Sequence, residues 1–202
     1  MKYGIPPDAF VFGMLCRLSH EKGVDNALRA LARLNAKHPD RSFYLVVAGE
    51  GSELDMLKAL ADQLGVQNRV KFVGFVKTPA AMLSAYDVIL FSSRVEGLPL
   101  GLLQGMAAGC IPIATRISGM PEAVHSPEVG WVVSPDDPAA LSDAMNAVLT
   151  LDVQKRLEMR QRVIRRVQDS FDLAECNRRI VELCEIRSEG SRSLRQQSFV
   201  TS

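Results

Sequence analysis

Residues 86–109, YDVILFSSRVEGLPLGLLQGMAAG, decide the fold, because an apolar run passes through a short polar loop directly into a helical pattern. The run YDVILF is too apolar for a strand with one solvated face, so it predicts a central parallel strand covered on both sides. Glu96 and several small residues follow it, at the point where an open α/β sheet collects ligands. The unpaired N–H groups at the start of the next helix favour an anionic ligand.

Five further apolar runs lie around this stretch and alternate with helical patterns. They begin at Phe10, Phe43, Val70, Ile111 and Trp131. Such alternation indicates βαβ units and therefore a parallel sheet of six strands. Helical patterns occupy residues 24–34, the stretch after Gly51, the stretch from Pro138, and residues 152–169 and 172–186. Ser52 is the predicted N-cap of the second helix, and Gly65 is its predicted C-terminal glycine.

Length and composition favour one globular domain in a reducing compartment. The chain has 202 residues, 47% of them hydrophobic, so it can bury one core, and a net charge of +1 gives no field that would attract nucleic acid. The four cysteines lack zinc-type spacing, no secretory signal begins the chain, and no stretch approaches the roughly 20 apolar residues of a membrane span. We expect a cytoplasmic protein with a linker remnant over 1–9, a domain over 10–187 and a disordered tail over 188–202.

Four loops, each between a strand and a helix, should meet at one edge of the sheet. They contain RLSHEKG, GEG, SSRVEGLPLG and TRISGMPE. In the first, Arg17 and Lys22 offer a forked donor and a point charge suited to a diphosphate, although two solvated surface cations would show the same spacing. Gly49 and Gly51 in the second permit close approach of the backbone, but a lone GxG often only makes a turn. A complete G-x-G-x-x-G is absent after the first strand, which argues against a dinucleotide-dependent oxidoreductase.

The fourth loop offers bare main chain and two side chains that can bind hydroxyls. The backbone that can meet an oxyanion at the helix start belongs to Gly97, Leu98, Leu100 and Gly101, with Pro99 at a first-turn position. Glu96 can accept hydrogen bonds from a polyol, and Gln104 can both donate and accept. An acidic residue that only complements the helix dipole is the alternative for Glu96. The three histidines have no metal-ligand spacing, so we expect no metal site.

The ordered set of motifs resembles the C-terminal, nucleotide-sugar-binding half of GT-B retaining glycosyltransferases of the glycogen-synthase and mannosyltransferase-like group. The segments that carry the resemblance, from about Phe10 to Ile186, are CRLSHEKGVD, VVAGEGSELDML, RVKFVGFV, FSSRVEGLPLGLLQGMAAGCIPIAT and SGMPEAV. The resemblance implies a three-layer α/β/α, Rossmann-like domain with a six-stranded parallel sheet, one half of a GT-B fold. Its N-terminal, acceptor-binding partner is absent from this chain.

The same resemblance implies roles for individual residues. Arg17 and Lys22 would hold the donor diphosphate, Glu96 would contact hydroxyls of the donor sugar, and the backbone of residues 98–101 would cradle the distal phosphate. The peptide region that would flank the base comprises Val73, Gly74 and Phe75.

Two residues depart from the family pattern. Gln104 stands where the family has a second glutamate that grips the ribose, and an amide loses the charge-assisted hydrogen bond. Cys16 stands where the family usually has glycine, so its side chain would crowd the donor pocket or the interdomain cleft.

The implied reaction transfers a sugar with retention, and without a metal or cofactor, from a nucleoside-diphosphate sugar to an acceptor hydroxyl in polysaccharide or glycoconjugate synthesis. UDP is the first choice of nucleotide. The expected partners are the donor and the missing N-terminal half. The protein is expected in the cytoplasm, either free or in peripheral contact with the inner face of a membrane through that N-terminal half. This chain alone should be inactive, because the chemistry occurs between two domains. A nucleotide-sugar epimerase and a non-catalytic nucleotide-sugar-binding module remain as alternatives.

Overall fold

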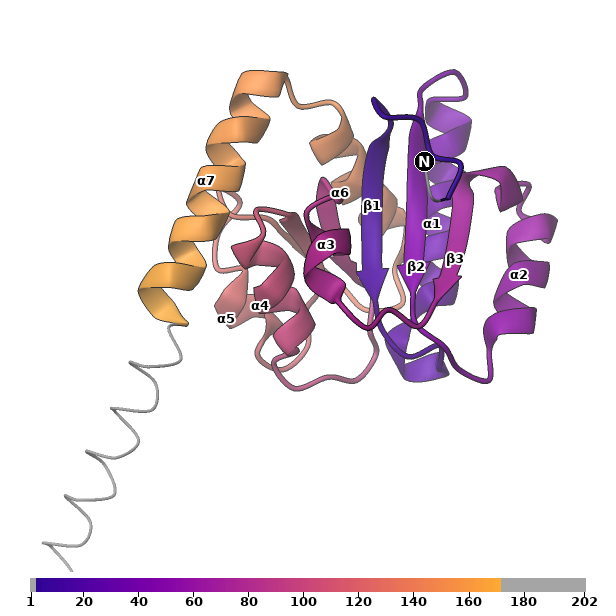
Figure 1. The fold of residues 1–202 in the computed structure, drawn as a ribbon, viewed down its shortest axis with the longest axis horizontal. Coiled ribbons are helices and arrows are strands. Elements are labelled where there is room, and N and C mark those ends of the chain that lie inside the picture. Colours follow the sequence, from indigo (N-terminus) through magenta and orange to yellow (C-terminus); the bar gives the residue numbers. More distant parts are fainter. Residues whose placement is uncertain (1–2, 172–202) are drawn as a thin grey trace, which may run out of the picture. The chain divides into compact units, whose positions relative to one another are not determined.

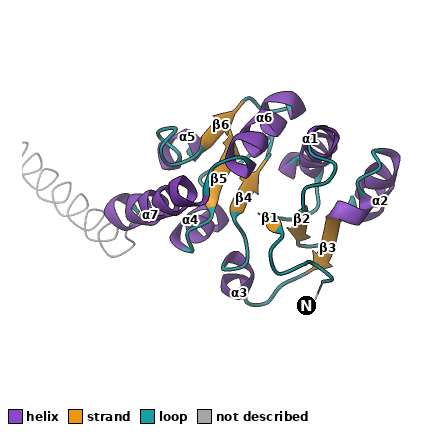
Figure 2. Cartoon of the chain, turned by 90° about the horizontal axis from the view of Figure 1, so that it is seen from above, coloured by secondary structure: helices purple, strands orange, loops and turns teal. Residues whose placement is uncertain are grey.

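A computed structural model describes residues 3–171 (Figure 1). They contain a six-stranded, all-parallel sheet in the order β3-β2-β1-β4-β5-β6, and Figure 2 labels all six strands. The strands are β1 (Phe10–Leu15), β2 (Phe43–Ala48), β3 (Val70–Gly74), β4 (Val88–Phe91), β5 (Ile111–Thr115) and β6 (Trp131–Val133). Each strand lies on a predicted apolar run, which confirms the α/β prediction. The strand order reverses between β1 and β4, and open sheets form their ligand sites at such a switch point.

Helices cover both faces of the sheet. They are η1 (His20–Lys22), α1 (Val24–Lys37), α2 (Leu54–Gln63), η2 (Gln67–Arg69), α3 (Pro79–Leu83), α4 (Leu100–Ala107), α5 (Met120–Ala123), α6 (Pro138–Leu149) and α7 (Val153–Ser170). Figure 2 shows α1, α2 and α6 on one side of the strands and α3, α4, α5 and α7 on the other. This is the predicted three-layer, Rossmann-like arrangement, which right-handed crossovers produce.

The main core lies between the sheet and the layer of α1 and α6. Leu28, Leu31 and Leu34 recur at helical spacing on α1, and all three are fully buried. They belong to the same apolar cluster as Phe12 and Phe43, whose rings meet edge to face at 6.5 Å. The helical pattern read from the sequence therefore marks the face of α1 that holds the sheet.

On the other face of the sheet, glycines allow neighbouring elements to pack closely. A Cβ on Gly13 would overlap the ring of Tyr86, so β1 must carry glycine where that ring lies against it. On α4, a Cβ on Gly105 would lie 2.9 Å from side-chain atoms of Ile89. The absence of a side chain at Gly105 lets α4 pack directly on β4, which fixes the start of α4 near the end of that strand.

The C-terminal end of α2 was predicted correctly, and its N-terminal end was not. Gly65 follows the last helical residues with a φ of 69°, as predicted for a C-terminal glycine. Ser52 is not the N-cap, because that position belongs to Glu53 and no side chain caps the helix. The N–H of Glu53 instead donates to the carbonyl of Leu18 at 3.2 Å. A neighbouring loop thus satisfies one N–H group at the start of α2, whereas a cap side chain would accept from an N–H further into the first turn.

Contacts divide the chain into a unit of residues 1–167 and a second unit of residues 168–202. The predicted helix over 172–186 and the predicted tail over 188–202 lie outside the described residues. Within residues 3–171 no helix combines the length and the apolar content that crossing a bilayer requires.

Candidate functional site

The loops after β1, β2, β4 and β5 meet at the carboxyl edge of the sheet, as the sequence predicts. Hydrogen bonds join the first three loops, from Leu18 N to Glu50 O (2.9 Å) and from Arg94 N to Glu21 O (2.7 Å). The loop after β5 packs on the loop after β4, since a Cβ on Gly119 would lie 3.0 Å from Leu98 Cβ. The loop after β1 and the loop after β4 each contact two of the others, so they form the centre of the site.

Lys22 and Glu96 face each other across this centre. The ammonium donates to Glu96 Oε1 at 2.5 Å, and Ser93 Oγ donates to the same oxygen at 3.2 Å. The side chains of Lys22 and Glu96 are 24% and 11% exposed, so water screens their attraction only in part. Gly23 turns the chain from Lys22 into α1 with a φ of 62°, and a Cβ there would collide with the carbonyl of Ser92.

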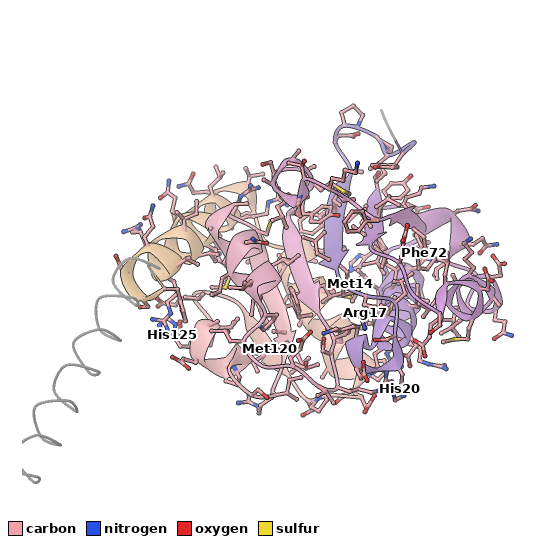
Figure 3. The ribbon with its side chains drawn as sticks, turned by 60° about the horizontal axis from the view of Figure 1, so that its bottom comes forward. Met14, Arg17, His20, Phe72, Met120 and His125 are labelled. Atoms are coloured by element: carbon pink, nitrogen blue, oxygen red, sulfur yellow. The ribbon has the colours of Figure 1, made fainter. Side chains whose placement is uncertain are left out.

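Arg17 is the second residue after the end of β1 and is exposed. Figure 3 turns the carboxyl edge of the sheet toward the viewer and shows Arg17 in the same loop as His20. Among residues 3–171 the Arg17 guanidinium has no ion pair, in contrast to Lys22. The sharing of one anion by Arg17 and Lys22 stays a prediction.

The GEG loop lies close against the loop after β1. A Cβ on Gly49 would overlap the carbonyl of Cys16, and one on Gly51 would overlap that of Leu18. Both glycines therefore serve the packing of two loops, and their contact with a ligand stays a prediction. Cys16 is half-buried, and burial, opposed by the charge of Lys22, raises the pKa of its thiol to about 12. The thiol is therefore neutral and unreactive at physiological pH.

The N-terminus of α4 lies at the same edge. The helix begins at Leu100, so the prediction that Pro99 occupies the first turn is wrong by one position. Pro99 is the N-cap, with an extended ψ of 125°, and its carbonyl accepts from Leu102 N at 3.0 Å. The N–H groups of Leu100 and Gly101 have no acceptor within the helix and can bind an anion. Gln104 is exposed one turn further along α4.

The segment predicted to flank a base lies at the end of β3, beside the GEG loop. The carbonyl of Gly74 accepts from Gly49 N at 2.8 Å, and Gly74 has a φ of 72°. Phe75 is 68% exposed. It lines a cavity of about 1280 Å³ whose walls include Val11 and Tyr86 and whose lining contains no member of the Lys22–Glu96 centre. The role of Val73, Gly74 and Phe75 in base binding stays a prediction.

One strongly connected residue was missed in the sequence. Arg94 stands in the stretch that decides the fold, but its spacing from Glu96 predicts nothing about its partners. The guanidinium binds Asp25 on α1 at 2.9 Å and Asp136 before α6 at 2.7 Å. Burial opposes ionisation of Asp25, yet hydrogen bonds from Arg94 and its charge lower the pKa of Asp25 below its usual 3.8. No sequence pattern marks the partners, which lie 69 and 42 residues away.

No group of three or more side chains able to hold a metal ion occurs among residues 3–171. Within residues 3–171 the site thus combines a cation paired with a carboxylate, a second cation that has no ion pair and a helix N-terminus. Such a combination can bind an anion that also carries hydroxyl groups.

Comparison with known proteins assigns the family. The model of the family described as glycosyl transferases group 1 matches residues 1–169. The chain belongs to this family. The match confirms the resemblance read from the motif set, and it covers the whole sheet and all four loops.

Curated glycosyltransferases are similar in sequence to this chain over most of its length. D-inositol 3-phosphate glycosyltransferase of Corynebacterium jeikeium is 34% identical over an alignment of 164 residues that covers 77% of this chain and 39% of that protein. Glycogen synthase of Mycobacterium tuberculosis is 35% identical over an alignment of 159 residues that covers 77% of this chain and 37% of that protein. The chain thus spans less than half the length of the glycosyltransferases it matches.

Solved glycosyltransferase structures share the fold. The C-terminal domain of a group 1 glycosyl transferase, LpcC, from Francisella tularensis has a TM-score of 0.73 and 26% identity over 84% of this chain and 89% of that chain. Anabaena Alr3699/HepE, solved with UDP-glucose, has a TM-score of 0.79 and 25% identity over 88% of this chain and 49% of that chain. The sheet and its helices therefore correspond to the C-terminal half of a GT-B glycosyltransferase.

Proposed function

We propose that this chain is the donor-binding domain of a retaining glycosyltransferase that moves a sugar from a nucleoside-diphosphate sugar to an acceptor hydroxyl. The observation that carries the proposal is the Lys22–Glu96 pair, at 2.5 Å, on the carboxyl edge of the sheet. A sugar diphosphate carries an anion next to a ring of hydroxyls. A cation and a carboxylate side by side match that order of groups.

The proposed chemistry depends on stabilising the leaving group. When the bond to the anomeric carbon breaks, the departing diphosphate gains negative charge. Lys22, Arg17 and the first N–H groups of α4 would stabilise that charge with preorganised donors and without help from a metal. Glu96 would hold the sugar by accepting hydrogen bonds from its hydroxyls, after donor binding has separated it from Lys22.

UDP is the nucleotide we propose first. Anabaena Alr3699/HepE has been solved with UDP and with UDP-glucose, and this chain matches it over 88% of its own length. In the proposed complex Gln104 hydrogen-bonds the ribose as a neutral amide, and the region of Val73 and Gly74 lies beside the base. The amide makes a weaker bond than a carboxylate would, so we expect moderate affinity.

The proposed reaction needs a second domain that holds the acceptor, because a sugar must be exchanged in a cleft that excludes water. We place the natural product in polysaccharide or glycoconjugate synthesis in the cytoplasm, with the acceptor half as the partner and as the element that makes any peripheral membrane contact. The names of the curated relatives, a glycogen synthase among them, support that class of acceptor.

Isothermal titration calorimetry of the chain with UDP, ADP and GDP tests donor binding. We expect UDP to bind, and Arg17→Ala or Lys22→Ala to weaken binding by about tenfold or more, since each removes a charge-assisted hydrogen bond. Lys37→Ala is the matched control, because Lys37 pairs with Asp143 between α1 and α6, outside the site. Failure of all three nucleotides to bind would refute the proposal.

A non-catalytic module that binds nucleotide sugar is the second candidate, and Gln104 in place of a glutamate is the observation that favours it. The chain joined to its natural acceptor half decides between the two. Transfer of labelled sugar supports the enzyme. Donor binding without transfer to any acceptor supports the module.

A further inference from the structure

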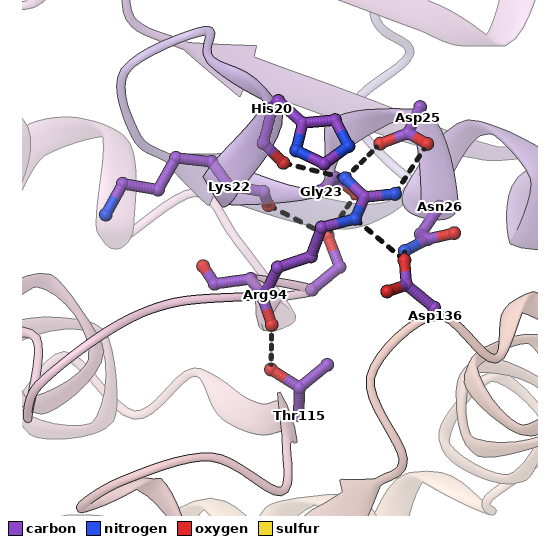
Figure 4. A network of polar contacts seen from close by, with 10 residues as sticks. His20, Lys22, Gly23, Asp25, Asn26, Arg94, Thr115 and Asp136 are labelled. Carbon is purple, nitrogen blue, oxygen red and sulfur yellow. Dashed lines mark hydrogen bonds and ion pairs between the residues drawn. The ribbon is translucent and has the colours of Figure 1, made fainter.

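Arg94 lies two residues before Glu96 and binds three segments at once (Figure 4). Its Nη1 and Nη2 donate to the two carboxylate oxygens of Asp25, each at 2.9 Å, and Nη1 also donates to the carbonyl of His20 at 2.7 Å. Nε donates to Asp136 Oδ1 at 2.7 Å. One planar group thus joins the β4–α4 loop to η1 and α1 on one side and to the β6–α6 loop on the other.

The two carboxylates are fixed by more than Arg94. Asn26, which is 6% exposed, donates to Asp136 Oδ1 at 2.8 Å. That hydrogen bond and the charge of Arg94 lower the pKa of Asp136, and Arg94 lowers the pKa of Asp25 against the effect of burial. Both carboxylates are therefore ionised at neutral pH. The Arg94 side chain is only 16% exposed, so its ion pairs are less screened than ordinary surface pairs.

Main-chain contacts continue the same connection on both sides of Lys22. The carbonyl of Glu21 accepts from Arg94 N at 2.7 Å, and the carbonyl of Gly23 accepts from Ser92 Oγ at 2.7 Å. The two residues that flank Lys22 are thus both bonded to the loop that carries Glu96. Any movement of that loop away from η1 would break these bonds and separate Lys22 from Glu96.

Arg94 itself contacts neither of the two side chains it brings together. Within residues 3–171 its side-chain partners are the carbonyl of His20 and the carboxylates of Asp25 and Asp136. Its influence on the Lys22–Glu96 pair is therefore indirect and acts through loop position. A role confined to global stability would leave the geometry of the pair unchanged, so the two roles make different predictions.

We propose that Arg94 is a positioning residue for donor binding, which locks the β1–α1 loop onto the β4–α4 loop so that Lys22 and Glu96 face one ligand. The identity of that ligand rests on the proposed function. A lysine at position 94 cannot replace the arginine, because a single ammonium cannot bind both oxygens of Asp25 and reach Asp136 together. Charge is kept in that variant while the fork geometry is lost.

The first experiment measures UDP affinity of the wild-type chain and of R94K, K22M and the R94K/K22M double variant by calorimetry. We expect R94K to weaken UDP binding by about tenfold in the wild-type background and by less than about twofold in the K22M background. Such non-additivity arises when one residue acts through the other. K37M, which removes the remote pair of Lys37 with Asp143, should leave UDP affinity unchanged.

The second experiment needs no ligand and compares deuterium uptake of the wild-type chain and R94K. We expect faster exchange in peptides covering residues 18–25 and 92–98, and unchanged exchange in β2 and α1 beyond residue 28. Equal weakening of UDP binding by R94K in both backgrounds overturns the proposal. A lower melting temperature with unchanged UDP affinity overturns it as well.

The two experiments separate the failure of this inference from the failure of the proposed function. If the wild-type chain binds none of UDP, ADP and GDP, the proposed function fails and the uptake data alone decide the role of Arg94. Faster exchange confined to the two loop peptides then supports loop locking. Faster exchange spread over the whole sheet refutes it.

Discussion

At the scale of single residues, the Glu96 carboxylate and a bound diphosphate would compete for the ammonium of Lys22. Without ligand the ammonium of Lys22 is 2.5 Å from the carboxylate of Glu96. A diphosphate would have to draw Lys22 away from that carboxylate and would also lie near its negative charge. The unliganded state thus neutralises the site internally, and binding must overcome this attraction.

Glu96→Gln should therefore tighten binding of UDP by about fivefold, the equivalent of about 1 kcal/mol for a partly buried ion pair. UDP-glucose should gain less, because the same substitution weakens contact with the sugar hydroxyls. Calorimetry with both ligands measures the difference. Glu21→Gln is the control, since Glu21 directly precedes Lys22 in η1 and its carboxylate accepts from Ser19 rather than from Lys22. Equal gains for the two ligands would contradict a sugar-binding role for Glu96.

Asp25 gives a prediction about pH and stability. Its pKa in the folded chain is lower than in the unfolded chain, so its ionised form stabilises the fold. The free energy of unfolding should fall more steeply in the wild-type chain than in Asp25→Asn as the pH drops below about 4, toward the lowered pKa. Urea unfolding from pH 7 to pH 3 measures this, with Asp62→Asn on the exposed side of α2 as the control. If the difference in free energy of unfolding between the wild-type chain and Asp25→Asn stays constant over this pH range, the prediction is refuted.

At the scale of elements, the packing of α4 on β4 places the helix N-terminus in the site. Gly105 brings the two elements together, because the nearest Ile89 atoms would lie 2.9 Å from an added Cβ. Those atoms include Ile89 Cβ, which cannot rotate away. Overpacking therefore decides the outcome of a substitution there, although alanine has the higher helix propensity.

Gly105→Ala should lower the free energy of unfolding, because overpacking costs about 1–3 kcal/mol. The higher helix propensity of alanine offsets at most about 1 kcal/mol of that loss. Chemical denaturation measures this change. Gly97→Ala is the control, since an added Cβ there meets nothing within 4 Å. A more stable Gly105→Ala chain would show that α4 can shift outward freely, and would weaken the claim that α4 is held on β4.

At the scale of the whole molecule, this chain corresponds to one half of the proteins it resembles. It covers 37–39% of the length of the glycogen synthase and the inositol-phosphate glycosyltransferase compared above. All donor-side groups of the proposal belong to this chain, on the four loops, on the first turns of α4 and at the end of β3. Groups that hold and activate an acceptor are expected on another domain.

The isolated chain should therefore bind donor without transferring sugar. UDP at 100 times its dissociation constant should stabilise the chain by about 2.7 kcal/mol, which raises its melting temperature, whereas UDP-glucose with a panel of sugar acceptors should give no product. Differential scanning fluorimetry and a radiolabelled-sugar assay measure the two effects. Rapid transfer by this chain alone would contradict the division of labour proposed here.

The fold could be predicted from the sequence because its signals are local. Six apolar runs of strand length alternate with helical patterns, and each run became a strand. Errors occurred at helix starts, where a local pattern does not fix the first residue and each boundary lies one residue later than predicted. At α2 the N-cap is Glu53 rather than the predicted Ser52, and at α4 the helix begins one residue after Pro99 rather than including it.

The candidate site was predictable only as a set of loops that share an edge. Parallel strands put their carboxyl ends together, so the sequence by itself determined that the loops of Lys22 and Glu96 would meet, 74 residues apart in the chain. Tertiary structure alone decided that Arg94 would join Asp25 and Asp136, since neither partner lies within helical or strand spacing of it. Periodicity encodes which face of an element is buried, but ion pairs between loops depend on loop paths that only the packed molecule fixes.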